Sequence, residues 1–256
     1  MYRFKQPNFI HILKRTLSTN IEQGKKLAAI KAVEETINPN KHKVIGIGSG
    51  STIKYAIDQI AQRDDLKHLI YIPTSYQTKQ LITNMKLTLG TLEECSNGID
   101  ITIDGADEVD QNLSCIKGGG GCLFQEKLVA QASDQFIVIA DERKKSTNLG
   151  TKWTQGIPIE VIPMAVPSIQ KILKKKYPQS SIQLRMAHPS TFAGPTITEN
   201  GNFLLDCHLG PLDSHAMDIY QDIKSLTGVL EVGLFCNMAN KAYFGNVDNT
   251  VEIWVK

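Results

Sequence analysis

From residue 44 to residue 140 the chain alternates short apolar runs with segments whose apolar residues recur at helical spacing. Four apolar runs have the length of buried strands: 44–47, 69–73, 99–103 and 136–140. Four segments predict helices: about 21–35, 53–60, 75–82 and 123–132. Strands that alternate with helices predict an α/β fold, a Rossmann-like and mostly parallel sheet with helices on both faces.

After residue 150 the sequence changes character. Prolines cluster there: Pro158, Pro163, Pro167, Pro178, Pro189, Pro195 and Pro211. Short apolar runs at 182–185 and 203–205 flank Asn200-Gly201, a dipeptide typical of a tight hairpin turn. The closing runs, 242–245 and 251–255, can return to the first sheet as strands. The chain is therefore expected to have three parts: a flexible N-terminal extension at 1–20, an α/β domain at 21–150 joined by 239–256, and a smaller α+β domain at 151–238.

The net charge of +2, from 28 basic and 26 acidic side chains, is unevenly distributed. All four charged residues among the first 20 are basic: Arg3, Lys5, Lys14 and Arg15. The remaining chain is therefore −2 (24 − 26). A slightly acidic body argues against nucleic-acid binding, which needs a basic face. An anionic ligand is instead expected to meet a few local groups.

The cysteines and the N-terminal segment bear on the compartment. Five scattered cysteines without a C-x-x-C pair favour neither a disulfide framework nor a zinc site, and they indicate a reducing compartment. No apolar run approaches the roughly 18–20 residues of a membrane span, so no membrane partner is expected. Residues 1–20 are basic and free of acids, as in a transit peptide. We expect a cytoplasmic protein, with organellar import through residues 1–20 as the alternative.

Residues 46–52, G-I-G-S-G-S-T, join the first predicted strand to a helix. Free N–H groups at the start of a helix attract anions, and glycine lets the backbone approach a ligand closely. The segment lacks the third glycine of G-x-G-x-x-G, whose place Ser51 takes, and it lacks the P-loop lysine. A phosphate-binding turn and a merely tight strand–helix turn both remain open.

Carboxylates follow the third predicted strand in the segment D-G-A-D-E-V-D, residues 104–110. The carboxyl ends of parallel strands are where open α/β sheets bind ligands. Catalytic carboxylates, a solvated acidic turn and a metal site are the three interpretations. A calcium or magnesium site would need more oxygen ligands at a recognised spacing, and the EF-hand pattern is absent.

Four consecutive glycines stand in the segment K-G-G-G-G-C-L-F-Q-E-K, residues 117–127. Because glycine is costly in backbone entropy, such a run favours a sharp bend or contact with a ligand over a flexible loop, which remains the alternative. Glu126 lies about one helical turn beyond the run. Asp141-Glu142-Arg143-Lys144 follows the fourth predicted strand and offers a cation at the same sheet edge, unless it is only a charged surface run.

Taken together, these motifs resemble ribose-5-phosphate isomerase of the metal-independent A type. The motifs occur in the family's order and with fitting separations: G-S-G-S-T, D-G-A-D-E-V-D, K-G-G-G-G-x-L-x-x-E-K and D-x-R-K. The resemblance extends over residues 21–256, and the segment 156–165, G-I-P-I-E-V-I-P-M-A, is similar to eukaryotic members. In two departures, Cys122 stands where the family usually has alanine and Thr227-Gly228 replaces a common Pro-Gly.

The resemblance implies a set of site residues. The implied substrate-binding residues are Ser49, Gly50, Ser51, Thr52, Asp104, Gly105, Ala106, Asp107, Lys117, Gly118, Gly119, Gly120 and Lys144. Glu126 matches the catalytic base. Asp104 and Lys117 are expected to assist it, and Lys25 or Lys26 can add charge near the phosphate. The implied partners are a phosphosugar and further copies of the chain, as a homodimer or homotetramer, with no cofactor and no metal.

The implied reaction interconverts ribose 5-phosphate, an aldose, and ribulose 5-phosphate, a ketose, in the non-oxidative pentose phosphate pathway. A proton moves between neighbouring carbons through an enediol(ate), so one carboxylate that faces both carbons suffices. The alternative is a phosphosugar-sensing module without turnover, which the presence of Glu126 and the absence of a helix-turn-helix segment disfavour. A dinucleotide-dependent oxidoreductase is disfavoured by Ser51.

Overall fold

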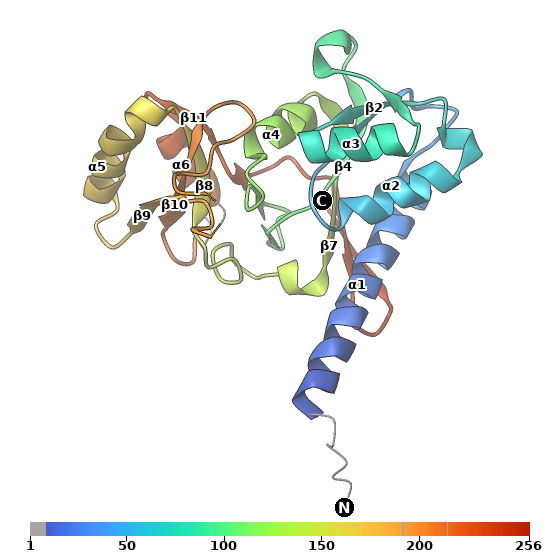
Figure 1. Cartoon of the computed structure of the whole chain (residues 1–256), viewed down its shortest axis with the longest axis horizontal. Helices are drawn as coiled ribbons and strands as arrows, with labels where there is room; N and C mark the ends of the chain where they lie inside the picture. Colours follow the sequence, from blue (N-terminus) through green and yellow to red (C-terminus); the bar gives the residue numbers. More distant parts are fainter. Residues whose placement is uncertain (1–8, 191, 214) are drawn as a thin grey trace, which may run out of the picture.

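A computed structural model of the chain describes residues 9–190, 192–213 and 215–256 (Figure 1). Seven strands form the largest sheet, in the order β14-β13-β7-β4-β1-β2-β3. Their bounds are β1 Val44–Ile47, β2 Ile70–Pro73, β3 Thr88–Leu89, β4 Ile99–Asp104, β7 Ser133–Asp141, β13 Lys241–Gly245 and β14 Val251–Val255. All neighbours pair in parallel except β13 and β14. The predicted mostly parallel sheet is confirmed, and the two closing strands lie at one edge.

Helices cover both faces of this sheet. The helices are α1 Phe9–Thr36, α2 Ile53–Gln62, α3 Tyr76–Asn84 and α4 Leu123–Gln131. Residues of α1, α2 and α3 pack with Ile137 and Ile139 of β7, whereas Ala130 of α4 packs with Phe136 and Val138 of the same strand. Because side chains alternate along a strand, the two sets lie on opposite faces. Each fully buried isoleucine stabilises the fold by about 1.5–3 kcal/mol relative to an exposed one.

The first helix is longer than the sequence pattern indicates. It was expected from about Ile21, with a flexible extension before it, but the helix begins at Phe9. The physical reason is that residues 9–20 contain neither proline nor glycine, so nothing in the backbone interrupts the helix. The expected start of the helix at about Ile21 is therefore wrong, whereas the flexibility of the N-terminal segment stays a prediction, and residues 1–8 lie outside the described residues.

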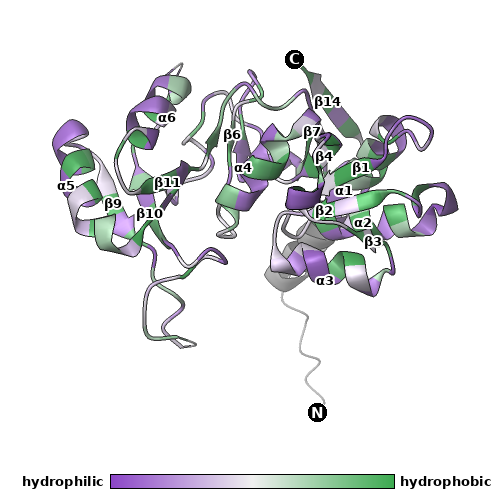
Figure 2. Cartoon of the chain, turned by 90° about the horizontal axis from the view of Figure 1, so that it is seen from above, coloured by the Kyte–Doolittle hydropathy of each residue, from purple (hydrophilic) through white to green (hydrophobic). Residues whose placement is uncertain are grey.

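The second half of the chain builds an antiparallel sheet in the order β11-β8-β10-β9. Its elements are β8 Ile157–Val161, α5 Val166–Lys176, β9 Ser181–Leu184, β10 Phe203–His208, α6 Ala216–Lys224 and β11 Val229–Val232. The apolar side of α5 packs into a separate core, and hydrophilic and hydrophobic residues alternate along this helix (Figure 2). Thr198 N–H donates to Asn202 O, which closes the predicted hairpin turn. The domain boundary at residue 150 stays a prediction.

Three two-residue strands connect these regions in the order β12-β6-β5. They are β5 Glu108–Val109, β6 Cys115–Ile116 and β12 Leu234–Phe235. Four short 3₁₀ helices complete the described secondary structure: Asp64–Leu66, Leu92–Glu94, Glu142–Lys144 and Pro163–Ala165. No helix in the described part of the chain is long and apolar enough to cross a membrane.

Candidate active site

A cavity of about 250 Å³ opens beyond the carboxyl ends of β1, β4 and β7. Twelve of the fourteen substrate-binding and catalytic residues that the resemblance implies line it: Ser49, Gly50, Ser51, Thr52, Gly105, Ala106, Asp107, Lys117, Gly118, Gly120, Glu126 and Lys144. The other two, Asp104 and Gly119, lie directly behind this lining, where they bond to Lys117 and Asp107. The structure thus brings the four sequence motifs to one place.

The turn after β1 is held tightly against the end of β4. Gly48 leaves no space for a side chain, because a Cβ there would lie 1.8 Å from the Asp104 carboxylate. The Asp104 carboxylate accepts a hydrogen bond from the Ser49 N–H at 3.1 Å. The Ser49 hydroxyl lies 2.8 Å from the Thr74 hydroxyl and 2.6 Å from that of Ser75, which caps α3 as the sequence predicts. Gly50 has φ of +104°, a conformation that favours glycine.

Two of the expected cations, Lys25 and Lys144, line the same cavity as this turn. Lys25 of α1 donates to the Ser51 hydroxyl at 3.0 Å and pairs with Glu22 at 2.8 Å. Of the two lysines proposed for this role, Lys25 lines the cavity and Lys26 does not. Lys144 also lines the cavity, with its ammonium 5.5 Å from the centre of the Trp153 ring.

Sequence reasoning missed one lining residue that bonds to this turn. Gln77 lies in the first turn of α3, and its side-chain oxygen accepts from the Gly50 N–H at 3.3 Å. No motif marks Gln77, since it reaches the turn from a separate helix.

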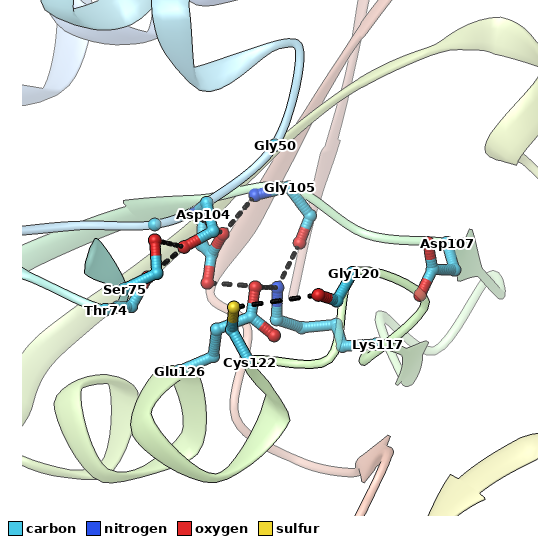
Figure 3. A network of polar contacts seen from close by, with 12 residues as sticks. Gly50, Thr74, Ser75, Asp104, Gly105, Asp107, Lys117, Gly120, Cys122 and Glu126 are labelled. Atoms are coloured by element: carbon cyan, nitrogen blue, oxygen red, sulfur yellow. Dashed lines mark hydrogen bonds and ion pairs between the residues drawn. The ribbon is translucent and has the colours of Figure 1, made fainter. Parts of the chain in front are cut away.

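A buried ion-pair cluster forms the floor of the cavity (Figure 3). The Lys117 ammonium lies 2.9 Å from Asp104 Oδ2 and 3.1 Å from Glu126 Oε1, and it donates to the Gly105 carbonyl at 2.6 Å. The side chains of Lys117, Asp104 and Glu126 are 2%, 0% and 7% exposed. They come from the loop after β6, the end of β4 and the first turn of α4. Two carboxylates therefore share one ammonium group.

This imbalance of charge shifts the proton affinities of the cluster. Burial, followed by the nearby Asp104 carboxylate, raises the pKa of Glu126 to about 8. Burial also raises the pKa of Asp104, against the effect of Lys117. Burial alone would lower the pKa of Lys117, but the two carboxylates together raise it above its ordinary value. Glu126 Oε2 is buried and has no hydrogen-bond partner among the described residues. The Glu126 carboxyl is thus suited to accept and release a proton near neutral pH.

The glycine run is an ordered turn with close neighbours. Gly118 has φ of +103°, and a Cβ there would lie 2.7 Å from Leu123. A Cβ on Gly119 would lie 2.6 Å from Trp153, whereas one on Gly120 would meet nothing within 4 Å. The Gly119 N–H donates to Asp107 at 2.7 Å. Glycine at the first two positions of the run therefore allows close packing, whereas Gly120 leaves open space beside the cavity.

The carboxylates of residues 104–110 have separate partners. Asp104 pairs with Lys117, and Asp107 accepts from the loop glycine. Glu108 is fully buried and accepts from the backbone N–H groups of residues 150–153, and Asp110 accepts from two N–H groups of its own turn. In the described ranges no group of three or more His, Cys, Asp or Glu residues is arranged to hold a metal ion.

Comparison with known proteins now gives the family. Residues 70–249 match the family model of ribose 5-phosphate isomerase A, also called phosphoriboisomerase A. The chain belongs to this family. It is 51% identical to the ribose-5-phosphate isomerase of Candida albicans, over 93% of this chain and 99% of the relative. It is 47% identical to that of Schizosaccharomyces pombe, over 91% and 83%.

Solved isomerases of the family have the same fold. A D-ribose-5-phosphate isomerase in complex with phospho-erythronic acid superposes with a TM-score of 0.84 at 34% identity, covering 92% of this chain and 99% of that one. The ribose 5-phosphate isomerase of Plasmodium falciparum gives 0.83 at 37% identity, with the same coverage. The resemblance seen in the sequence motifs is therefore confirmed at the level of family and fold.

Proposed function

We propose that this protein interconverts D-ribose 5-phosphate and D-ribulose 5-phosphate through an enediol(ate) in the non-oxidative pentose phosphate pathway. Membership of the ribose 5-phosphate isomerase A family supports this activity. The observation that carries it is the Glu126 carboxylate, which lines the cavity beside the Lys117 ammonium with one oxygen unpartnered among the described residues.

Glu126 is the proposed base. It removes the proton from C2 of the open-chain aldose, the C–H electron pair forms the C1=C2 bond, and the carbonyl π pair moves to O1. The O2 hydroxyl proton then passes to O1, the C1=C2 pair takes the proton back from the same carboxyl group at C1, and the electron pair left on O2 forms the C2 ketone. A positioned base of this kind contributes about 10²–10⁴-fold.

Lys117 and the glycine loop stabilise the charge that develops on oxygen. The ammonium is fixed by Asp104 and by the Gly105 carbonyl before substrate arrives, so little reorganisation is needed in the transition state. Asp107, at the other side of the loop, can hold a hydroxyl group of the open chain and move its proton during ring opening.

The phosphate is proposed to bind at the turn 49–52. The start of α2 supplies N–H groups, the turn supplies the hydroxyls of Ser51 and Thr52, and Lys25 and Lys144 supply positive charge. We further propose a homodimer or homotetramer in the cytoplasm. Native mass spectrometry checks the oligomeric state, and a single-chain mass would contradict it.

A coupled assay that converts ribose 5-phosphate to ribulose 5-phosphate tests the proposal. The wild type is expected to be active after exhaustive chelation, since no step uses a metal. Glu126→Gln is expected to lose almost all activity while its fold and its affinity for ribose 5-phosphate persist. Glu93→Gln, on an exposed glutamate, is the matched control. An active Glu126→Gln variant, or activity lost on chelation and restored by magnesium, would contradict the scheme.

A further inference from the structure

An arginine of the antiparallel sheet holds the glycine loop from behind. Arg185 directly follows β9, and its Nη1 donates to the carbonyl oxygens of Gly118 at 3.0 Å and Gly119 at 3.2 Å. The other edge of the guanidinium donates to Asp206 of β10, with Nε to Oδ2 at 2.9 Å and Nη2 to Oδ1 at 2.5 Å. The two side chains are only 16% and 14% exposed. One planar cation thus joins β10 to two consecutive peptide groups of the loop.

The direction of these carbonyls fixes the direction of the next two amides. In a trans peptide the C=O and N–H bonds point in opposite directions, and the described peptide bonds are trans. Because the Gly118 and Gly119 carbonyls face Arg185, the N–H groups of Gly119 and Gly120 point away from it. The Gly119 N–H accordingly meets Asp107, a cavity residue. The Gly120 N–H is directed to the same side, where Gly120 itself lines the cavity.

Successive N–H groups on one side of a turn make an anion-binding concavity. A run of glycines does not hold this arrangement by itself, since glycine has the largest backbone freedom of all residues. Two carbonyls bonded to one largely covered guanidinium, whose side chain is 16% exposed, remove that freedom at Gly118 and Gly119. The Gly120 N–H finds no acceptor among the described residues, so it is available to a ligand.

We propose that Arg185, oriented by Asp206, is a positioning residue for the isomerisation: it acts through the Gly118 and Gly119 carbonyls and aims the Gly120 N–H at the enediolate oxygen. The proposal rests on the proposed isomerase function. Arg185 is absent from the described cavity lining and touches no reacting atom. Its effect is therefore expected on the transition state and not on the phosphate.

The experiment compares Arg185→Ala and Arg185→Lys with Arg63→Ala, which removes an Arg–Asp pair at the end of α2. Because small misplacements of a site lower rates steeply, kcat of Arg185→Ala is expected to fall about 10–100-fold, with a much smaller change in KM. Inhibition by inorganic phosphate is expected to stay unchanged. Binding of phospho-erythronic acid, whose carboxylate resembles the planar, charged enediolate, is expected to weaken together with kcat. Added ethylguanidine is expected to restore part of the lost kcat.

If Arg185 only stabilised the fold, its removal would change the affinities for phosphate and phospho-erythronic acid alike, and ethylguanidine would not restore kcat. The proposal is overturned if folded Arg185→Ala retains wild-type kcat, or if phosphate and phospho-erythronic acid weaken equally. If Arg185→Ala does not fold, Arg185→Lys gives the same test, because lysine keeps the charge but lacks the planar fork. A wild type without isomerase activity would instead contradict the proposed function itself.

Discussion

One lysine before α4 and one within it are buried to the same extent, yet they lie in opposite electrostatic settings. Lys117 and Lys127 are each 2% exposed. At the cavity, one ammonium is shared by two carboxylates, those of Asp104 and Glu126. Between α4 and β11 the number of ammonium groups exceeds the number of carboxylates. There the single Glu231 carboxylate is shared by Lys127 at 2.9 Å and Lys224 at 3.1 Å.

The reversal explains the opposite proton affinities of the two lysines. The pKa of Lys117 is raised by its two carboxylates, whereas burial lowers the pKa of Lys127 to about 8. Lys127 also donates to the carbonyls of Val232 and Leu234 at 2.6 and 2.9 Å, and it is not one of the residues that line the described cavity. Excess negative charge at the cavity leaves a carboxylate able to move a proton. The second cluster fixes α4 to its neighbouring strands.

After Glu126→Gln, the largest effect on turnover is expected from Lys117→Met. Removing one preorganised donor to a developing oxyanion typically lowers kcat by about 10²–10³-fold. Steady-state kinetics on the purified variant measure the change. Lys127→Met is the matched control, since it removes an equally buried ammonium. Equal losses of kcat in both folded variants would contradict the distinction between the clusters.

Stability is expected to respond in the reverse order. Lys127→Met removes one partner of a buried ion pair and leaves two carbonyls unpaired, a change that typically costs about 3–5 kcal/mol. Thermal unfolding followed by circular dichroism is expected to show a melting temperature lower by roughly 10 °C. Lys117→Met is expected to lower it less, because Asp104 and Glu126 can then share a proton. A Lys127→Met variant as stable as the wild type would contradict the structural role.

The pH dependence of stability gives a third test, through Glu126. Its pKa is about 8 in the folded protein and 4.5 in the reference state, so the folded state binds more protons between these values. The stability that this group contributes is therefore complete below pH 4.5 and is lost as the pH rises through 8. Glutamine has no charge to bury. The melting temperature of Glu126→Gln is thus expected to exceed that of the wild type by an amount that grows across this range. A pH-independent difference would contradict the raised pKa.

The smallest effect is expected at Cys122, the cavity cysteine in the place of the family's usual alanine. Burial, followed by the charge of Glu126, raises the pKa of its thiol to about 12, so the thiol stays protonated and unreactive. Cys122→Ala is expected to keep wild-type kinetic constants, and iodoacetamide is expected to leave the wild type active. Rapid inactivation by iodoacetamide that Cys122→Ala prevents would contradict this environment.

Much of the sheet could be predicted, because its buried strands and amphipathic helices repeat with clear periods. The start of α1 could not be predicted, since only the absence of proline and glycine allows the helix to begin at Phe9. The site motifs are local in sequence, so they could be identified without the structure. The pairing of Asp104 with Lys117 was not, because no pattern shows which acidic residue of a turn faces inward. Gln77 and Arg185 reach the site from separate elements without a motif of their own.

Proton exchange with solvent tests the central claim, that the Glu126 carboxylate moves the proton between C2 and C1. Ribose 5-phosphate is incubated with enzyme in D₂O, and deuterium at C2 of the aldose and C1 of the ketose is followed by NMR. The wild type is expected to introduce deuterium at both carbons during turnover. Glu126→Gln is expected to exchange at least about 100-fold more slowly. Wild-type exchange in Glu126→Gln would contradict the account.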